Sequence, residues 1–376
     1  MALAAVPGYL GSQFDSASPG LRFGMYLQLW CADGSRKTTA QAQALERACR
    51  FNEADQQRMA AMQQRQAAMA ATLPDTQLLG LDAVTTAPFT TGLGNEHPLE
   101  NGFSFLNPHG LPYLPGSGVK GVLRQAATEL SKGSWGTAQQ EGWKTPWVDA
   151  LFGSMDPEQP RRGALQFWDV FPAIPGNRLA VDIMAPHQKH YYQDGDSPHD
   201  SGSPIPIFFL TVPPGSNFAF HVVCDTTLLR HTAPELESDS HWKKPLAAAF
   251  EHAFAWLGFG AKTAVGYGAM ETPTMAERRH HEHRVQEQEL KRKKEEALAA
   301  EQEKHATPWE RARIRFNRSN KSLSVEKDNK TAIAVAPQGE ALLASLPKDT
   351  RTKIERGQFA RVTAYVADHV LVRVEP

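Results

Sequence analysis

The chain has 376 residues, of which 41% are hydrophobic and 22% charged, and its formal net charge is -1. This composition excludes disorder throughout, and the length predicts two or three domains at roughly 100 to 200 residues each. No stretch approaches the roughly 20 unbroken apolar residues of a membrane-spanning helix, and no basic segment precedes the short apolar run at the start. We therefore expect neither a membrane span nor a secretory signal.

The cysteines argue against both disulfides and a zinc site. Cys31, Cys49 and Cys224 are odd in number, widely spaced and free of any CxxC pattern. A disulfide framework or a zinc knuckle would need paired or clustered cysteines. The sequence therefore predicts a cytoplasmic protein without a cofactor.

Charge is unevenly distributed along the chain. Residues 1–275 hold 19 basic and 25 acidic side chains, whereas residues 306–376 hold 13 basic and 8 acidic ones. A basic C-terminal segment suits a polyanion or an acidic partner surface. A net charge of this size is equally typical of a segment that is merely soluble.

Propensity and hydrophobic periodicity predict an α+β main domain. A helix is expected from Thr38 to Ala71, where glycine and proline are absent. The following elements, in order, are a strand from Thr76, a helix capped by Ser117, strands at 163–171, 179–184, 205–212 and 217–223, and a helix at 241–257 before a last strand. This order is that of a ferredoxin-like (RRM-like) fold with insertions.

The C-terminal third predicts a charged helix followed by a small β-barrel. Glutamate alternates with lysine and arginine between Ala276 and Lys304, and five β-like pieces follow Pro308. Such pieces suggest a barrel of the OB or S1 kind, whose Trp309, Phe316, Phe359 and Tyr365 would either stack on bases or fill the core. The expected domains are an N-terminal arm at 1–75, the main domain at 76–275, a connecting helix at 276–305 and a basic β-rich module at 306–376.

The first candidate site is the segment LPGSGVKGVLRQ, at residues 114–125. Ser117 marks the start of the predicted helix, and Lys120 and Arg124 lie four residues apart on one face. The positive end of a helix, a hydroxyl and a guanidinium together could bind a phosphate without reading a base. The alternative is an ordinary capped helix with two solvated cations. The GxxxxGK[ST] pattern is absent, so nucleotide hydrolysis is not supported.

The second candidate site is the glycine-rich segment LGFGAKTAVGYGAM, at residues 257–270. Its candidate ligand-contacting residues are Gly258, Gly260, Lys262, Thr263, Gly266 and Gly268. Such a loop can bring its backbone close to a ligand, and Lys262 adds positive charge. A helix C-cap followed by a β-bulge would explain only some of the glycines. A dinucleotide-binding loop is disfavoured because that loop follows a strand and opens a helix.

Taken together, these motifs resemble the RAMP superfamily of CRISPR-associated RNA-binding proteins, and within it the sixth subunit of type III-B (Cmr) effector complexes. The resemblance covers roughly residues 76–270. The runs that carry it lie at 91–105, 113–124, 163–172, 181–200 and 204–220. Asp182, Pro186 and His187, with the tyrosines and prolines after them, are more specific than the glycine loop.

The resemblance implies a non-catalytic backbone subunit near the 3′ end of the guide RNA. Its implied partners are guide RNA, target RNA, the neighbouring RAMP backbone subunit and a small helical subunit. Ser117, Lys120, Arg124 and the loop around Lys262 would contact guide phosphates. RNA cleavage would take place in the repeated neighbouring subunit, in the service of antiviral defence.

A RAMP-type endoribonuclease that processes precursor guide RNA is the alternative. Its proton-transferring residue would be one of His97, His109 and His187, because a histidine can act as acid or base near neutral pH. No partner side chain is fixed by spacing, so a structural role is favoured for all three. The histidines at 280, 281 and 283 lack the spacing of a helical metal site and are expected to be solvated.

Overall fold

The computed structural model describes residues 2–133, 143–158, 160–185, 195 and 206–376. The chain divides into two compact units, Met1–Glu277 and Arg278–Pro376. His187, one of the three candidate proton-transferring histidines, lies outside the described residues. Among the described residues, no helix is both long enough and apolar enough to cross a bilayer.

Unit 1 begins with short elements and two helices. These are β1 (Leu3–Ala4), α1 (Pro19–Phe23), β2 (Gln28–Trp30), α2 (Gln41–Cys49) and α3 (Glu53–Ala70), with 3-10 turns at Gly8–Leu10, Thr38–Ala40 and Asp75–Gln77. The prediction of one continuous helix from Thr38 to Ala71 is wrong, because α2 and α3 are separate helices. Arg50 is extended, and Asn52 opens α3 with a capping box in which Asn52 and Asp55 each accept the other's backbone N–H.

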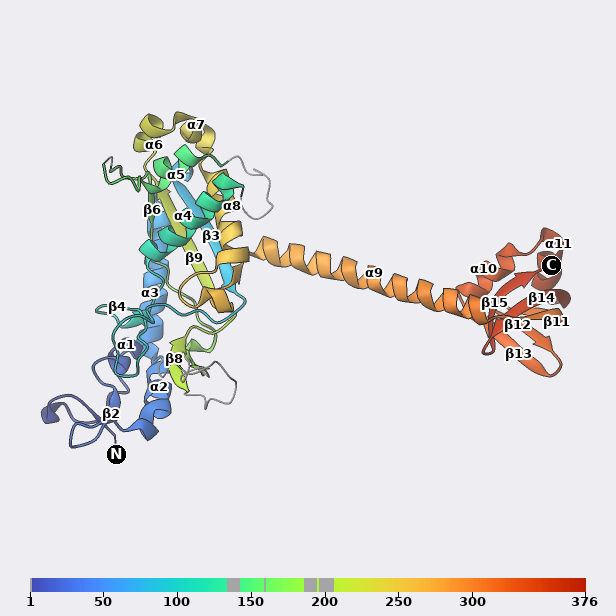
Figure 1. Cartoon of the computed structure of the whole chain (residues 1–376), viewed down its shortest axis with the longest axis horizontal. Helices are drawn as coiled ribbons and strands as arrows, with labels where there is room; N and C mark the ends of the chain where they lie inside the picture. The colour runs from blue at the N-terminus through green and yellow to red at the C-terminus, as the bar shows by residue number, and fades with distance from the viewer. Residues whose placement is uncertain (1, 134–142, 159, 186–194, 196–205) are drawn as a thin grey trace. The chain divides into compact units, whose positions relative to one another are not determined.

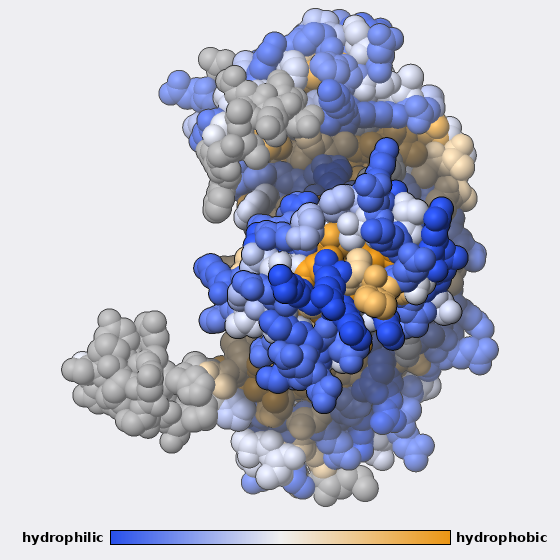
Figure 2. Space-filling view, turned by 90° about the vertical axis from the view of Figure 1, so that its right-hand side faces the viewer, coloured by the Kyte–Doolittle hydropathy of each residue, from blue (hydrophilic) through white to orange (hydrophobic). Residues whose placement is uncertain are grey.

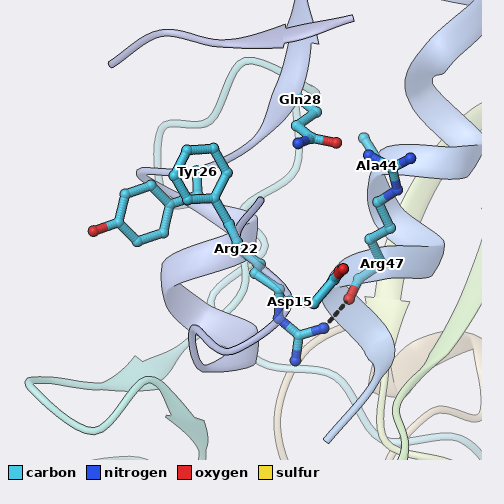
Figure 3. Close-up of a pocket in the computed structure, with 7 residues that line it drawn as sticks. Asp15, Arg22, Tyr26, Gln28, Ala44 and Arg47 are labelled. Atoms are coloured by element: carbon cyan, nitrogen blue, oxygen red, sulfur yellow. Dashed lines mark hydrogen bonds between the residues drawn. The ribbon is translucent and has the colours of Figure 1, made fainter. Parts of the chain in front are cut away.

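A buried arginine ties α1 to the ends of α2 and α3. The Arg22 guanidinium donates to the carbonyl oxygens of Arg47 and Arg50 and lies 3.8 Å from the fully buried Asp55 carboxylate. Figure 3 shows Arg22 beside a small pocket, with its guanidinium turned toward the backbone of Arg47. The break between α2 and α3 therefore exposes the carbonyls that bind Arg22.

A four-stranded antiparallel sheet forms the centre of unit 1. Its strands are β3 (Leu78–Thr85), β6 (Leu165–Phe167), β9 (Asn217–Cys224) and β10 (Met270–Glu271), in the order β10-β3-β9-β6. Helices α4 (Gly116–Lys132) and α8 (Lys243–His252) pack against each other and cover the sheet (Figure 1). Buried His252 on α8 joins them, with its Nε2 2.7 Å from Oε2 of Glu129 on α4.

Smaller elements surround this sheet. They are β4 (Phe105–Leu106), β5 (Leu111–Pro112), α5 (Thr145–Phe152), β7 (Ala180–Met184), β8 (Ile207–Thr211), α6 (Thr226–Thr232) and α7 (Pro234–Glu237), with 3-10 turns at Pro175–Asn177, Ser238–Ser240 and Thr263–Val265 and a π-helical turn at Ala253–Leu257. β7 and β8 form an antiparallel hairpin. The helix predicted at 241–257 is thus α8 plus the π-helical turn.

An aromatic cluster fixes the start of the glycine loop. The Phe220 ring of β9 lies 5.3 Å from the Phe250 ring, 5.7 Å from Phe254 and 5.3 Å from Phe259, measured between ring centroids. Phe259 is fully buried between Gly258 and Gly260. Because aromatic packing of this kind is strongly stabilising, the loop is anchored to the core at its first residues.

Unit 2 contains most of a long helix and a closed barrel. Its elements are α9 (Pro273–His305, which begins in unit 1), β11 (Thr307–Asn317), β12 (Ser322–Lys327), β13 (Lys330–Ala334), α10 (Gln338–Ser345), α11 (Lys348–Glu355), β14 (Ala360–Ala367) and β15 (Val370–Glu375). The strands close in the order β11-β12-β13-β15-β14, with β13 and β15 parallel. The predicted α+β class with a small barrel is confirmed, but α11 was not predicted.

The three cysteines are free thiols. Cys49 and Cys224 are buried, and burial raises the pKa of each thiol to about 12. Cys31 is partly exposed. Buried thiols of this kind behave as small apolar side chains.

Candidate nucleic-acid interface

The N-cap of helix α4 lies two residues earlier than predicted, at Pro115 instead of Ser117. Pro115 holds the N-cap position without a side-chain hydrogen bond, and Ser117 is exposed. The Gly116 N–H donates to Oδ1 of Asp169, at 2.7 Å. A Cβ on Gly116 would lie 2.2 Å from the Phe167 carbonyl oxygen, so the helix starts tight against the end of β6. The Asp169 carboxylate thus already accepts a hydrogen bond from one N–H at the positive end of α4, and this N–H is not available to a phosphate.

The two cations of α4 have different surroundings. Arg124 donates to the Gly153 carbonyl oxygen at 2.8 Å and lies 3.6 Å from the Asp149 carboxylate of α5. It therefore ties α4 to α5. Lys120 is half-buried and forms no ion pair with any described residue. Of the two, Lys120 is the side chain that remains available to a phosphate.

The glycine loop is pressed against the protein's own backbone. The four glycines at 258, 260, 266 and 268 all have positive φ angles. A Cβ on Gly260 would lie 2.2 Å from the Thr90 carbonyl oxygen, and one on Gly268 would lie 1.8 Å from the Phe259 carbonyl oxygen. Only glycine permits these approaches. Gly266 differs, because it is exposed and has no atom within 4 Å of an added Cβ.

Lys262 lies over a polar and aromatic cluster that the sequence did not single out as a site. Its Nζ is 3.7 Å from the Met184 sulfur, 5.6 Å from the Phe209 ring centroid and 6.0 Å from that of Tyr267. The Tyr267 hydroxyl donates to Oδ2 of Asp182 at 2.6 Å. Burial and the nearby Asp182 carboxylate raise the pKa of Tyr267 to about 12, so this phenol stays protonated. The sequence did not reveal this cluster because its residues come from β7, β8 and the glycine loop, which are far apart along the chain.

The structure places the two candidate segments at different edges of the sheet. Gly116 contacts the end of β6, whereas the glycine loop leads into β10, which is the opposite outer strand. The loop hydrogen-bonds to the segment after β3, with Ala261 N–H donating to Thr90 and Gly268 N–H donating to Pro88. A single ligand touching both segments would have to extend along the molecule, as a strand of RNA can.

The two described candidate histidines, His97 and His109, have different surroundings. His97 stacks on Phe23 with ring centroids 3.8 Å apart, its Nε2 lies 3.0 Å from the Phe23 carbonyl oxygen, and its Nδ1 accepts from the Leu99 N–H. Both nitrogens thus bind backbone. His109 is exposed beside a groove lined by Met62, Met69 and Trp168.

Histidine burial predicts a pH-dependent stability. Burial lowers the pKa of His97 and of His221 below the usual 6.5, and Nδ1 of His221 has no hydrogen-bond partner. Below pH 6.5 these histidines become protonated in the unfolded chain but stay neutral in the folded chain. Their contribution to the free energy of unfolding is therefore fully present above pH 6.5 and decreases as the pH falls below it. We expect His221→Gln to reduce this fall by up to about 1.4 kcal/mol per pH unit, measured by urea unfolding between pH 7 and 5.5.

The exposed His231 on α6 provides the matched control. His231→Gln removes a histidine from the same unit without changing a buried ring. If His231→Gln altered the pH dependence as strongly as His221→Gln, burial would not be its cause.

Most of the part of the chain that forms the sheet, its two covering helices and the glycine loop matches a known family. The family model of the RAMP superfamily matches residues 82–271, just over half of the chain. The chain belongs to the RAMP superfamily. The matched RAMP region includes α4 and the whole glycine loop, and it ends before α9 and the barrel.

Two curated relatives of this RAMP protein are named as subunits of a CRISPR system. The Cmr subunit Cmr6 of Pyrococcus furiosus is 28% identical in an alignment of 235 positions, with 50% of this chain and 65% of that protein covered. Cmr6 of Saccharolobus solfataricus is 25% identical over 173 residues, covering 46% of this chain and 49% of that protein. The alignments thus span less than two thirds of these relatives.

Solved structures show weaker likeness to the RAMP protein. A chain of the type III-B Cmr-beta complex bound to cognate target RNA has a TM-score of 0.39 and 18% identity, with 62% of this chain and 70% of that chain covered. The crystal structure of Cmr6 from Pyrococcus furiosus has a TM-score of 0.27 and 25% identity, with coverage of 52% and 97%.

Proposed function

We propose that this protein is a non-catalytic, guide-RNA-binding backbone subunit of a type III-B CRISPR ribonucleoprotein. It would lie near the 3′ end of the guide and support target-RNA recognition in antiviral defence. The observation that carries the proposal is the RAMP match over residues 82–271, together with two relatives named Cmr6. The proposed partners are guide RNA, target RNA, a neighbouring RAMP backbone subunit and a small helical subunit.

The proposed RNA contacts come from both candidate segments. Lys120, without an ion pair among described residues, and Lys262, over the Tyr267 cluster, would hold phosphates. Exposed Ser117 would donate a hydrogen bond, and the open space at Gly266 would admit the RNA backbone. Gly258, Gly260 and Gly268 would act by shaping the loop, and Thr263 by its position within it. Arg124 would contribute less, because Asp149 already neutralises it.

We also propose finer assignments for the two folds. The sheet order β10-β3-β9-β6, with α4 and α8 inserted between its strands, supports a ferredoxin-like core. The barrel order β11-β12-β13-β15-β14, with helices between β13 and β14, supports an OB-like module. On this view, the arm, core, connecting helix and module are the four domains set out above.

The proposal is tested by removing one cation from each segment of the full chain. Lys120→Ala with Lys262→Ala should weaken guide-RNA binding equally for unrelated spacer sequences, because phosphates carry no sequence information. Each lost phosphate contact lowers the slope of log affinity against log salt by roughly 0.7, so we expect a total decrease of roughly 1.4. Affinities measured at several salt concentrations give this slope.

Lys132→Ala with Lys244→Ala is the matched control, because it removes the same charge from exposed positions on α4 and α8. An unchanged slope in the first variant, or an equal decrease in the control, would overturn the site. The recovered RNA should be intact. Shortened products of precursor guide RNA would instead support the endoribonuclease alternative.

A further inference from the structure

Arginines face each other across two strands on the outside of the barrel. Ala312 and Ile314 of β11 point into the core, so Arg313 and Arg315 between and after them are exposed. Arg313 lies directly opposite Arg361 of β14, which is also exposed. Like charges in directly opposed positions destabilise an antiparallel pair. The barrel therefore maintains a repulsive pair on its surface.

No described acidic side chain forms an ion pair with Arg313 or Arg361. Glu326 of β12 is the other register neighbour of Arg313, yet no ion pair joins them, and neither Arg315 nor Arg361 has one with any described residue. We define Arg313, Arg315 and Arg361 as the arginine face. The surface that unit 2 presents in Figure 2 is largely hydrophilic. An uncompensated arginine face is complementary to an anion that reaches several guanidinium groups.

An exposed aromatic ring lies beside the arginine face. The Phe359 side chain is 53% exposed, and its ring centroid is 5.2 Å from Cζ of Arg313. Phe359 directly precedes β14, and Arg361 is the second residue of that strand, so the ring and this guanidinium come from neighbouring positions of the chain. An exposed phenylalanine gains nothing from an acidic protein surface, whereas the bases of a single strand stack on such rings.

We propose that the arginine face binds single-stranded nucleic acid, with phosphates on Arg313, Arg315 and Arg361 and one base stacked on Phe359. Guanidinium groups suit phosphates because their forked donors match two oxygens at once. This surface is formed by the first and fourth strands of the barrel. The outer positions of the second and third strands hold Ser324, Glu326, Thr331 and Ile333, and their basic side chains are Lys327 and Lys330, at the turn that joins the two strands. The site lies outside the region matched by the RAMP model.

The test uses the full chain carrying Lys120→Ala and Lys262→Ala, so that the proposed guide-RNA contacts do not contribute. Binding of a uridine oligonucleotide and a thymidine oligodeoxynucleotide is measured at several salt concentrations. Arg313→Gln with Arg361→Gln should lower the log-log salt slope by roughly 1.4 for whichever oligonucleotide binds. Phe359→Ala should weaken binding at least about fivefold, and Phe359→Tyr should retain it.

Lys348→Gln with Lys353→Gln on α11 removes the same charge from elsewhere on the barrel and is the matched control. Removal of one opposed arginine should not lower thermal stability, so circular dichroism separates lost binding from misfolding. Failure of both oligonucleotides to bind, equal effects in the control, or binding only of polyglutamate would overturn the proposal. Loss confined to the arginine and Phe359→Ala variants would support it.

Discussion

Replacing Asp55 by alanine is expected to lower the free energy of unfolding of unit 1 by about 3–5 kcal/mol. The Asp55 carboxylate is fully buried 3.8 Å from the Arg22 guanidinium, whose side chain is only 6% exposed. Without the carboxylate, the Arg22 guanidinium stays in the interior bound to the carbonyl oxygens of Arg47 and Arg50 and loses its buried counter-charge. The same substitution removes the capping box of α3. Both losses act where α1, α2 and α3 meet.

Urea unfolding followed by tryptophan fluorescence measures this loss, because seven of the eight tryptophans precede residue 278. Arg58→Ala is the matched control. Arg58 Nη1 lies 3.0 Å from the same carboxylate, but its side chain is 47% exposed, so we expect a loss of less than about 1 kcal/mol. Equal decreases in the free energy of unfolding in the two variants would show that the buried Arg22–Asp55 pair contributes no more to stability than the exposed Arg58.

Gly268→Ala is expected to destabilise unit 1 by about 2–5 kcal/mol. The new Cβ would lie 1.8 Å from the Phe259 carbonyl oxygen, and the backbone at φ +70° disfavours any side chain. The expected loss combines overpacking, at roughly 1–3 kcal/mol, with a left-handed conformation, at roughly 1–2 kcal/mol. The same urea unfolding measures it.

Gly266→Ala separates these two causes. Gly266 has φ +93° but open space around its Cα, so alanine there should cost only the conformational part, roughly 1–2 kcal/mol. If Gly268→Ala were no worse than Gly266→Ala, the close approach to Phe259 would not hold the loop in place.

Local patterns account for the elements that the sequence predicted. In the barrel, Val362, Ala364 and Val366 are buried in alternation, and this period identified β14 without tertiary information. The charged helix α11 escaped prediction because Ile354 is its one buried residue. The break before α3 had a local signal in Asn52 and Asp55, which form a capping box, but the absence of glycine and proline favoured a continuous helix.

The candidate site depended on contacts that no local pattern contains. Asp169 is 53 residues from the Gly116 N–H that it binds, and Tyr267 is 85 residues from Asp182. Sequence spacing correctly placed Lys120 and Arg124 on one helix, yet only the position of Asp149 shows that Arg124 is already paired. The residue types of a site can thus be read locally, whereas their availability is a tertiary property.

The closure of the barrel limits how other molecules can recognise it. Its five described strands pair in a ring that closes between β13 and β15 at one register pair, Ile333 with Val370, so little strand edge remains for another chain to extend. The sheet of unit 1 instead ends in β10 and β6, of two and three residues. Recognition of the barrel therefore relies mainly on side chains. Single substitutions on its surface can change what it binds while every backbone hydrogen bond is kept, which makes this module a place where new specificity can evolve at little structural risk.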